Sequence, residues 1–299
     1  MKILDRRDFM HSVTGLAAAG LVPISQLPAI CAEPNGGAAI ANFRFGLVTY
    51  MWGSDWNLPI LLTNCEKAGA LGIELRTGHA HGVEPGISAD SIRDVIHRFK
   101  DSPVKLIGLG SNQDFHHVDP NKLRASIERA KEFIKLSHAI GGSGVKVKPN
   151  DLPKEVPQQK TIEQIGRTLN ELGAFAAQYG QQVRLEVHGQ CAPLPILAGI
   201  MQVADHPSVA VCWNSNPQDL QGEGLEHNFR LVQKRLGATL HARQLESKEY
   251  PYPQLFKLLT GIRYKGWLLI EANDMPPDRV AALARERQAF DKLIAKSAS

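Results

Sequence analysis

The sequence lacks the features that would connect it to nucleic acid or to a disulfide framework. Its 34 Lys and Arg residues nearly balance 30 Asp and Glu residues, and no basic stripe interleaved with aromatic residues is present. A nucleic-acid partner is therefore not expected. The four cysteines have neither C-x-x-C nor zinc-finger spacing. Cys65 and Cys212 stand in apolar surroundings, which predicts buried thiols.

Two further absences narrow the fold. After residue 42, no apolar run approaches the roughly 20 residues of a membrane-spanning helix, so no membrane contact is expected beyond the N-terminal segment. No G-x-G-x-x-G motif follows an early strand, which removes the usual support for a doubly wound, dinucleotide-binding sheet. The chain of 299 residues is long enough for one large α/β domain.

The N-terminus is typical of an export signal. Arg6-Arg7 and Phe9 precede Val13–Ile30, an apolar run rich in Ala and Gly. This pattern resembles a twin-arginine signal, which exports folded proteins, often with a cofactor bound. We expect a signal peptide over residues 1–32, a linker over residues 33–42 and a periplasmic protein. An uncleaved anchor or a fortuitous basic start is the alternative, because Ile30 stands where a cleavage site prefers a small residue.

After residue 42, short apolar runs alternate with longer amphipathic ones. The predicted strands are Phe43–Tyr50, Gly72–Arg76, Val104–Gly110, Gly144–Lys148, Val183–His188, Val209–Trp213, Thr239–Ala242 and Trp267–Ala272. The predicted helices are Leu58–Leu71, Ala89–Phe99, Pro120–Ile140, Thr161–Tyr179, Leu194–Ala204, Glu226–Leu236, Tyr252–Leu259 and Pro277–Lys296. This alternation predicts an α/β protein with a single-domain (β/α)8 TIM barrel over residues 43–299, with an open doubly wound sheet as the competitor.

Alternation within the strands places ionisable residues on one face. In R-L-E-V-H (184–188), Leu185 and Val187 share one face, and Arg184, Glu186 and His188 share the other. The same division pairs Glu74 with Arg76, Lys146 with Lys148, His241 with Arg243, and Glu271 with Asn273. Isolated buried charges cost several kcal/mol unless they are paired or bind a metal. We therefore predict a functional site, with a solvated sheet face or a closed ion-pair network as the alternative.

Four consecutive strand ends supply a set of metal ligands. Glu186, Asn214, His241 and Glu271 stand at or just after the ends of the last four predicted strands. In a TIM barrel these ends converge at the mouth. Two carboxylates, an imidazole and an amide oxygen suit Mn²⁺, Mg²⁺ or Co²⁺ better than a thiolate-rich zinc site.

These strand ends resemble the xylose isomerase-like TIM-barrel superfamily of sugar (phosphate) isomerases and epimerases. The resemblance rests on L-E-V-H-G (185–189), V-C-W-N-S-N (211–216), L-H-A-R-Q-L (240–245) and L-L-I-E-A (268–272). Family members bind a divalent cation through Glu, Asp, His and Glu. Glu186, His241 and Glu271 match three of these ligands, while Asn214 replaces the Asp. Pro217 stands where many members have a further His.

The resemblance implies a metal-dependent sugar isomerase or epimerase. In the family, one carboxylate removes the proton α to a carbonyl and a second carboxylate returns it, and Glu186 and Glu271 resemble that catalytic pair. A metal-dependent dehydratase or lyase of a keto-sugar or cyclitol is the enzymatic alternative. A non-catalytic sugar-binding barrel is the alternative of another class. A small sugar or sugar derivative is the expected partner, and the sequence leaves a homo-oligomer open.

Further polar residues are candidates for substrate binding. They are His79 and His81 after the second predicted strand, Lys146 and Lys148 in the fourth, His188 after Glu186, and Arg243 after His241. His116-His117 is a weaker candidate, and Asn216 is either a turn residue or a substrate ligand.

Overall fold

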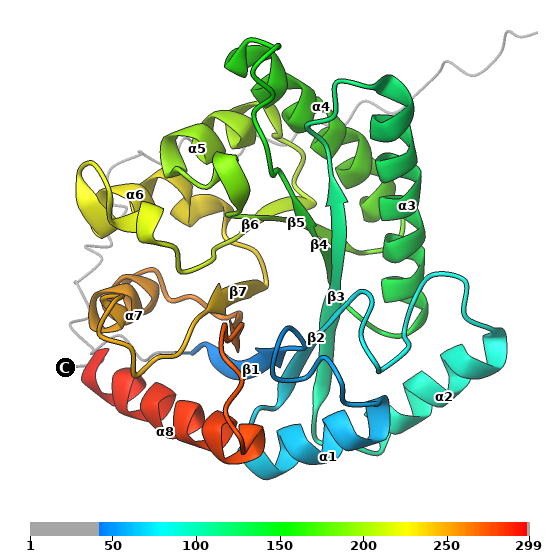
Figure 1. Ribbon diagram of the computed structural model, residues 1–299, viewed down its shortest axis with the longest axis vertical. Coiled ribbons are helices and arrows are strands. Elements are labelled where there is room, and N and C mark those ends of the chain that lie inside the picture. Colours follow the sequence, from blue (N-terminus) through cyan, green and yellow to red (C-terminus); the bar gives the residue numbers. More distant parts are fainter. Residues whose placement is uncertain (1–41, 298–299) are drawn as a thin grey trace, which may run out of the picture. The chain divides into compact units, whose positions relative to one another are not determined.

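Eight parallel strands form a barrel that eight α-helices surround, in a computed structural model that describes residues 42–297 (Figure 1). The fold is therefore the predicted (β/α)8 TIM barrel. The predicted signal peptide, and the predicted linker up to residue 41, lie outside the described residues. Within the described part of the chain, no helix has the length and apolar character that crossing a membrane requires.

Strands and helices alternate along the chain. The strands are β1 (Arg44–Val48), β2 (Gly72–Arg76), β3 (Lys105–Asp114), β4 (Gly144–Lys148), β5 (Gln182–Glu186), β6 (Val209–Cys212), β7 (Thr239–Ala242) and β8 (Trp267–Ile270). The helices are α1 (Leu58–Ala68), α2 (Ala89–Lys100), α3 (Pro120–Ala139), α4 (Gln158–Ala177), α5 (Leu194–Val203), α6 (Gly224–Val232), α7 (Tyr252–Gly261) and α8 (Arg279–Ser297). Short 3-10 turns are η1 (Gly189–Cys191), η2 (Pro217–Leu220) and η3 (Gln233–Arg235).

Polar residues fix the starts of the early helices. The Asn57 side chain accepts from the backbone N–H of Ile60, and Ser88 does the same for Ser91. Asp119 accepts from the Asn121 N–H, with a proline in the first turn that follows. Such caps satisfy N–H groups that have no partner within the helix. Ser88 and Asp119 thus fix where α2 and α3 begin.

Neighbouring strands pair all around the barrel except between β6 and β7. The strand order is β6-β5-β4-β3-β2-β1-β8-β7, with parallel pairing throughout. Between β6 and β7 there are only isolated bridges, Val211 with Leu236 and Asn214 with His241. The His241 N–H donates to the Trp213 carbonyl at 2.7 Å, and the Ser215 N–H donates to the His241 carbonyl at 3.2 Å. Two predicted ligands therefore lie side by side at this seam.

The long third strand differs from its prediction. It continues to Asp114, four residues beyond the predicted end at Gly110, through the polar run S-N-Q-D. The register against β4 shifts between Gly110 and Asp114, where Asp114 pairs with Lys148, and Ser111 Oγ donates to the Lys146 carbonyl at 2.8 Å. Apolar patterning cannot detect this extension, because its residues are polar and their contacts come from another strand.

Glycines leave room for large side chains inside the lower barrel. A Cβ at Gly72 would lie 2.3 Å from the Trp267 ring, and one at Gly144 would lie 2.9 Å from the Arg184 guanidinium. Trp267 belongs to a small interior cluster with Val48, Ile107 and Leu269. The main apolar core packs between strands and helices. Free Cys65 and Cys212 are buried, as predicted.

Candidate functional site

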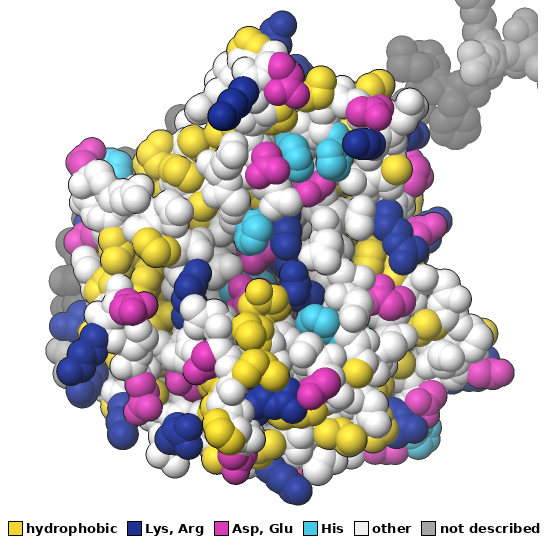
Figure 2. All heavy atoms as spheres, viewed as in Figure 1, with side chains coloured by type: hydrophobic (Ala, Val, Ile, Leu, Met, Phe, Trp, Pro, Cys, Tyr) yellow, Lys and Arg dark blue, Asp and Glu magenta, His cyan; other side chains and the backbone are white. Residues whose placement is uncertain are grey.

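A cavity of about 440 Å³ opens at the mouth of the barrel, where the strands end at their carboxyl termini. Its lining includes Glu186, Asn214 and Glu271 of the predicted ligand set, and Lys148, His188 and Arg243 of the predicted substrate-binding set. Figure 2 shows Lys or Arg, Asp or Glu, and His side chains gathered around a hollow on the face in view. Many of the sequence candidates thus share one cavity.

Glu186 forms a buried ion pair with Lys146 at the mouth. Its Oε2 lies 2.8 Å from Nζ of Lys146, and both side chains are almost fully enclosed. Burial opposes ionisation of Glu186, but Lys146 and His241 outweigh it and hold the pKa of Glu186 well below its ordinary value. Lys146 therefore lies below the cavity as the partner of Glu186, rather than in its lining.

A second carboxylate orients His241. Nε2 of His241 lies 3.2 Å from Oε1 of Glu74, and Thr239 Oγ1 donates to the other oxygen of Glu74 at 3.4 Å. Nδ1 of His241 then faces Oε1 of Glu186 at 3.5 Å and Oε2 of Glu271 at 3.6 Å. A carboxylate behind the ring is the usual support of a metal-binding histidine.

Asn214 bridges the two catalytic candidates. Its Nδ2 donates to Oε1 of Glu186 and to Oε2 of Glu271, each at 3.0 Å. Carboxylates only accept, so the amide nitrogen must face them in this arrangement. Turning the amide by half a rotation would present Oδ1 at the same place. Asn214 can thus neutralise the carboxylates as a donor or coordinate a cation as an acceptor.

The donor set fits a divalent cation. Ligand atoms of Glu186, His241 and Glu271 all lie within 4.8 Å of one another. His241 Nδ1 is buried without a hydrogen-bond partner among the described residues and faces the gap between the carboxylates. Oxygen and imidazole donors of this kind suit Mn²⁺, Mg²⁺, Co²⁺ or Zn²⁺. These three residues, with the Asn214 amide, would hold the ion.

A hydrogen-bonded chain runs from His188 to the end of β3. Asn150 Nδ2 donates to Oδ2 of Asp114 at 2.5 Å, and Oδ1 of Asn150 lies 2.8 Å from Nδ1 of His188. Because the amide nitrogen faces Asp114, its oxygen must accept from His188 Nδ1–H. In the neutral ring, Nε2 is then the free acceptor. Burial is the main cause that lowers the pKa of His188 and favours this neutral form.

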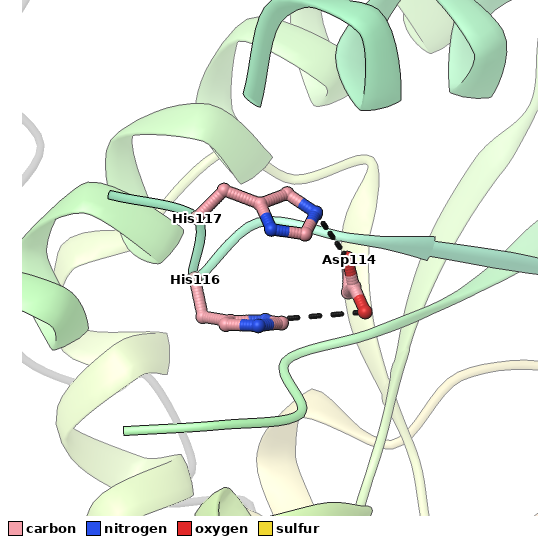
Figure 3. Close-up of side chains that lie close together, drawn as sticks. All are labelled: Asp114, His116 and His117. Carbon is pink, nitrogen blue, oxygen red and sulfur yellow. Dashed lines mark ion pairs between the residues drawn. The ribbon is translucent and has the colours of Figure 1, made fainter. Parts of the chain in front are cut away.

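Asp114 also binds the histidine pair that was a weaker candidate (Figure 3). Its Oδ1 lies 2.7 Å from Nε2 of His117, and its Oδ2 lies 3.9 Å from Nδ1 of His116. The three donor groups are close enough to share a metal ion. Both oxygens of Asp114 already have partners, however, so we interpret the cluster as a support for Asn150 and His188.

The two histidines after β2 lie outside the lining of the cavity. His81 has both ring nitrogens bonded to the main chain: Nε2 lies 2.8 Å from the Arg76 carbonyl, and Nδ1 accepts from the Val83 N–H at 3.0 Å. His79 Nδ1 lies 3.1 Å from Oγ1 of Thr49. His81 therefore holds the loop after β2 in place.

Asn216 forms hydrogen bonds that hold the loop after β6 in place. Its Nδ2 donates to the Val187 carbonyl at 2.7 Å, and its N–H donates to Oδ2 of Asp219 at 2.9 Å. The residue also lines the cavity. Of the two roles that the sequence allows, the turn role has direct contacts to support it.

Three residues at the mouth were not among the sequence candidates for the site. Arg76 and Tyr50 line the cavity and stack on each other, with the guanidinium carbon 4.7 Å from the ring centre. Arg76 could have been found from the sequence, because it lies on the same face of its strand as Glu74. Asn150, which supports His188, has a positive φ of 57°. Asparagine tolerates that conformation, but K-P-N-D in the sequence indicates only a turn.

The family follows from comparison with known sequences. The sequence profile described as the xylose isomerase-like TIM barrel matches residues 62–293. The chain belongs to this family. At the mouth of this xylose isomerase-like barrel, Glu186, His241 and Glu271 lie close together, and Asn214 bridges the two glutamates. A comparison with curated proteins found no match.

Solved structures with the same barrel include several sugar epimerases. The apo 3-keto-D-glucoside 4-epimerase YcjR from E. coli has a TM-score of 0.71 at 14% identity, covering 84% of this chain and all of that one. An L-ribulose 3-epimerase has a TM-score of 0.74 at 15% identity, with 85% and 95% covered. An IolI protein with a bound zinc atom has a TM-score of 0.68 at 17% identity, with 85% and 99% covered. At such identities the likeness shows the fold.

Proposed function

We propose that the protein is a divalent-metal-dependent sugar isomerase or epimerase that moves a proton α to a carbonyl group. The observation that carries the proposal is the pair of carboxylates, Glu186 and Glu271, which face one cavity and share the Asn214 amide. A histidine oriented by Glu74 completes the set. The epimerase names of several similar barrels support the same reaction class.

The two carboxylates have different surroundings, and we assign them different parts of the reaction. Glu186 is held by Lys146, and this ion pair reduces its basicity. Glu271 has no ion pair with a described Lys or Arg, and its side chain is 14% exposed toward the cavity. Glu271 is therefore the better acceptor of the substrate proton. Return of a proton through Glu186 on the other side of the sugar would require Lys146 to supply that proton, because the ion pair otherwise keeps Glu186 ionised.

A divalent ion held by Glu186, Asn214, His241 and Glu271 would polarise the substrate carbonyl and so acidify the neighbouring C–H bond. The His188 ring, fixed by Asn150, would accept a hydrogen bond from a sugar hydroxyl through Nε2. The enclosed Lys146 keeps Glu186 ionised, which maintains the negative charge that metal binding requires.

Deuterium incorporation tests this proposal directly. Protein purified without chelator is analysed for bound metal and incubated in D₂O with a panel of keto-sugars, with Mn²⁺, Mg²⁺ or Co²⁺ added. We expect exchange at a carbon α to the carbonyl, and Glu271→Gln should slow it by about a thousandfold, the typical contribution of a general base. Glu246→Gln, which changes an exposed residue after β7, is the control. Absence of exchange with every ion and sugar would contradict the proposal.

Export by the twin-arginine route is a separate proposal that rests on Arg6-Arg7 and the apolar run after them. Fusion of residues 1–42 to a reporter, with Arg6-Arg7 changed to Lys-Lys as the control, would test it. Export of the reporter that does not depend on the two arginines would argue for a different route.

A further inference from the structure

Three cationic side chains line the cavity without a carboxylate partner. They are Arg76 at the end of β2, Lys148 at the end of β4 and Arg243 just after β7. None of them forms an ion pair with a carboxylate of the described residues. Among residues 42–297, only two carboxylates, Glu186 and Glu271, line the same cavity, and Lys146 already neutralises the first. The mouth therefore has an excess of positive charge.

Three arginines elsewhere in the barrel illustrate cations that folding does supply with partners. Arg279 makes a two-point ion pair with Asp55, and Arg235 donates to four backbone carbonyls. Arg184 is enclosed but donates to side-chain and backbone oxygens around it. A cation that folding leaves unpaired inside a cavity requires solvent or a ligand to neutralise it.

Arg76 is held in place but keeps donors free. Its guanidinium stacks on Tyr50, and one terminal nitrogen donates to Oδ1 of Asn112 at 3.3 Å. Its Nε is buried without a hydrogen-bond partner among residues 42–297. A planar guanidinium with free donors binds carboxylate or phosphate oxygens well, because two parallel N–H bonds match two oxygens.

Lys148 lies within electrostatic reach of Arg76. It is half-buried, and no hydrogen bond or ion pair holds its ammonium group within the described residues. Burial, followed by the charges of Lys146 and Arg76, lowers the pKa of Lys148. Folding thus brings like charges together at one side of the mouth, where an anion would relieve their repulsion.

We propose that the ligand of this cavity is an acidic sugar, whose carboxylate or phosphate group binds between Arg76 and Lys148, with Arg243 as a third cation. The acidic group then lies on the β2–β4 side of the mouth. The remainder of the sugar extends toward Glu271 and the metal ligands of β5–β8. The proposal rests on the proposed function only in taking the ligand to be a sugar, because binding of the acidic group does not depend on the chemistry at Glu271.

Matched ligand pairs test this inference by isothermal titration calorimetry on the full chain. D-Galacturonate is compared with D-galactose, and D-glucose 6-phosphate with D-glucose. We expect at least one acidic sugar to bind about tenfold more tightly than its neutral partner. The pair with the larger difference in affinity shows whether the site prefers a carboxylate or a phosphate. The gain should fall between 50 mM and 300 mM NaCl, as salt screens exposed charges. Equal affinity within both pairs would overturn the inference.

Substitutions of the cavity cations test which side chains bind the acidic group. Lys148→Gln and Arg76→Gln should each weaken binding of the acidic sugar about tenfold and leave the neutral sugar unchanged. Lys154→Gln changes an exposed lysine in the loop that follows β4 and is the matched control. Lys148 has no side-chain bonds to lose, so its variant remains informative if Arg76→Gln fails to fold. Equal weakening of both sugars, or none, would contradict the assignment.

The same measurements separate this inference from the proposed reaction. Acidic sugars that bind through Lys148 without hydrogen exchange in any keto-sugar would support the anion subsite and contradict the isomerase proposal. Exchange in neutral keto-sugars, together with equal affinity for acidic and neutral ligands, would support the isomerase proposal and contradict the anion subsite.

Discussion

Two inward-facing cations on neighbouring strands of this barrel differ in whether they have hydrogen-bond partners. Arg184 of β5, in the lower interior, donates to Oε1 of Gln182 at 2.9 Å, to Oγ of Ser143 at 2.6 Å and to the Ile107 carbonyl at 3.4 Å. Lys148 of β4, at the mouth, has no such partner among the described residues. The face of the strand on which a charged side chain lies therefore does not by itself indicate a functional residue. A functional cation is instead indicated when the folded protein gives its charged group no hydrogen-bond or ion-pair partner.

Replacing these two cations should change the free energy of unfolding by different amounts. Arg184→Met removes the hydrogen bonds that Arg184 donates to Gln182, Ser143 and Ile107, so we expect it to lower the free energy of unfolding by about 3 kcal/mol. Lys148→Met removes no described bond and should change stability by less than about 1 kcal/mol. Urea denaturation of both variants measures the difference. Similar losses would show that Lys148 is a structural residue and erase the distinction.

A smaller effect should follow from restoring a carboxylate at the seam of the barrel. Asn214→Asp adds negative charge facing Glu186 and Glu271, so affinity for Mn²⁺ should rise about tenfold, or about 1.4 kcal/mol. The metal-free variant should be less stable, because three carboxylates then repel one another. Titration with Mn²⁺ and thermal unfolding with and without chelator measure both effects. Unchanged affinity would mean that Asn214 is not a ligand.

A pH-dependent effect concerns Asp219, a buried acid with one carboxylate oxygen that has no hydrogen-bond partner among the described residues. Oδ2 of Asp219 accepts from Tyr250 Oη at 2.7 Å, while Oδ1 is buried without a partner among the described residues. Burial raises the pKa of Asp219 from 3.8 to about 7. The folded protein thus retains a proton that the unfolded chain loses above about pH 4. Stability should therefore fall as pH rises from about 4 to 7, and stay lower above that range.

Asp219→Asn removes this titration. We expect the variant to be more stable than the parent at pH 8, by about 4 kcal/mol, and nearly equal to it at pH 4. Urea midpoints across this pH range provide the measurement. A parallel pH profile in both proteins would show that Asp219 is ionised in the fold despite its burial.

Much of the fold could be predicted from local pattern. The bounds of β2, β4 and β7 agree with their predictions, since each is a short run of alternating or continuous apolar residues. The end of β3 could not be predicted, because its polar residues pair with β4 only after a register shift. Helix α1 ends three residues early, where Gly69 adopts a left-handed conformation.

The candidate site was predicted in part. The sequence indicated that Glu186, His241 and Glu271 would converge, and their ligand atoms do share one small volume. The role of Lys146 as a partner of Glu186, the support of His188 by Asn150, and the engagement of His81 with the main chain depend on residues far apart in sequence or on loop geometry. The roles assigned to these residues in binding and catalysis stay predictions.

The sequence by itself determined the barrel and the inward face of each strand, because the alternation of side chains along a strand and the alternation of strands with helices are local properties. Only the tertiary structure decided which inward charges are neutralised. Arg184, Lys146 and Lys148 have the same parity and similar chemistry in the sequence. Their difference arises from partners on other strands, whose distance and number become fixed only when the barrel closes.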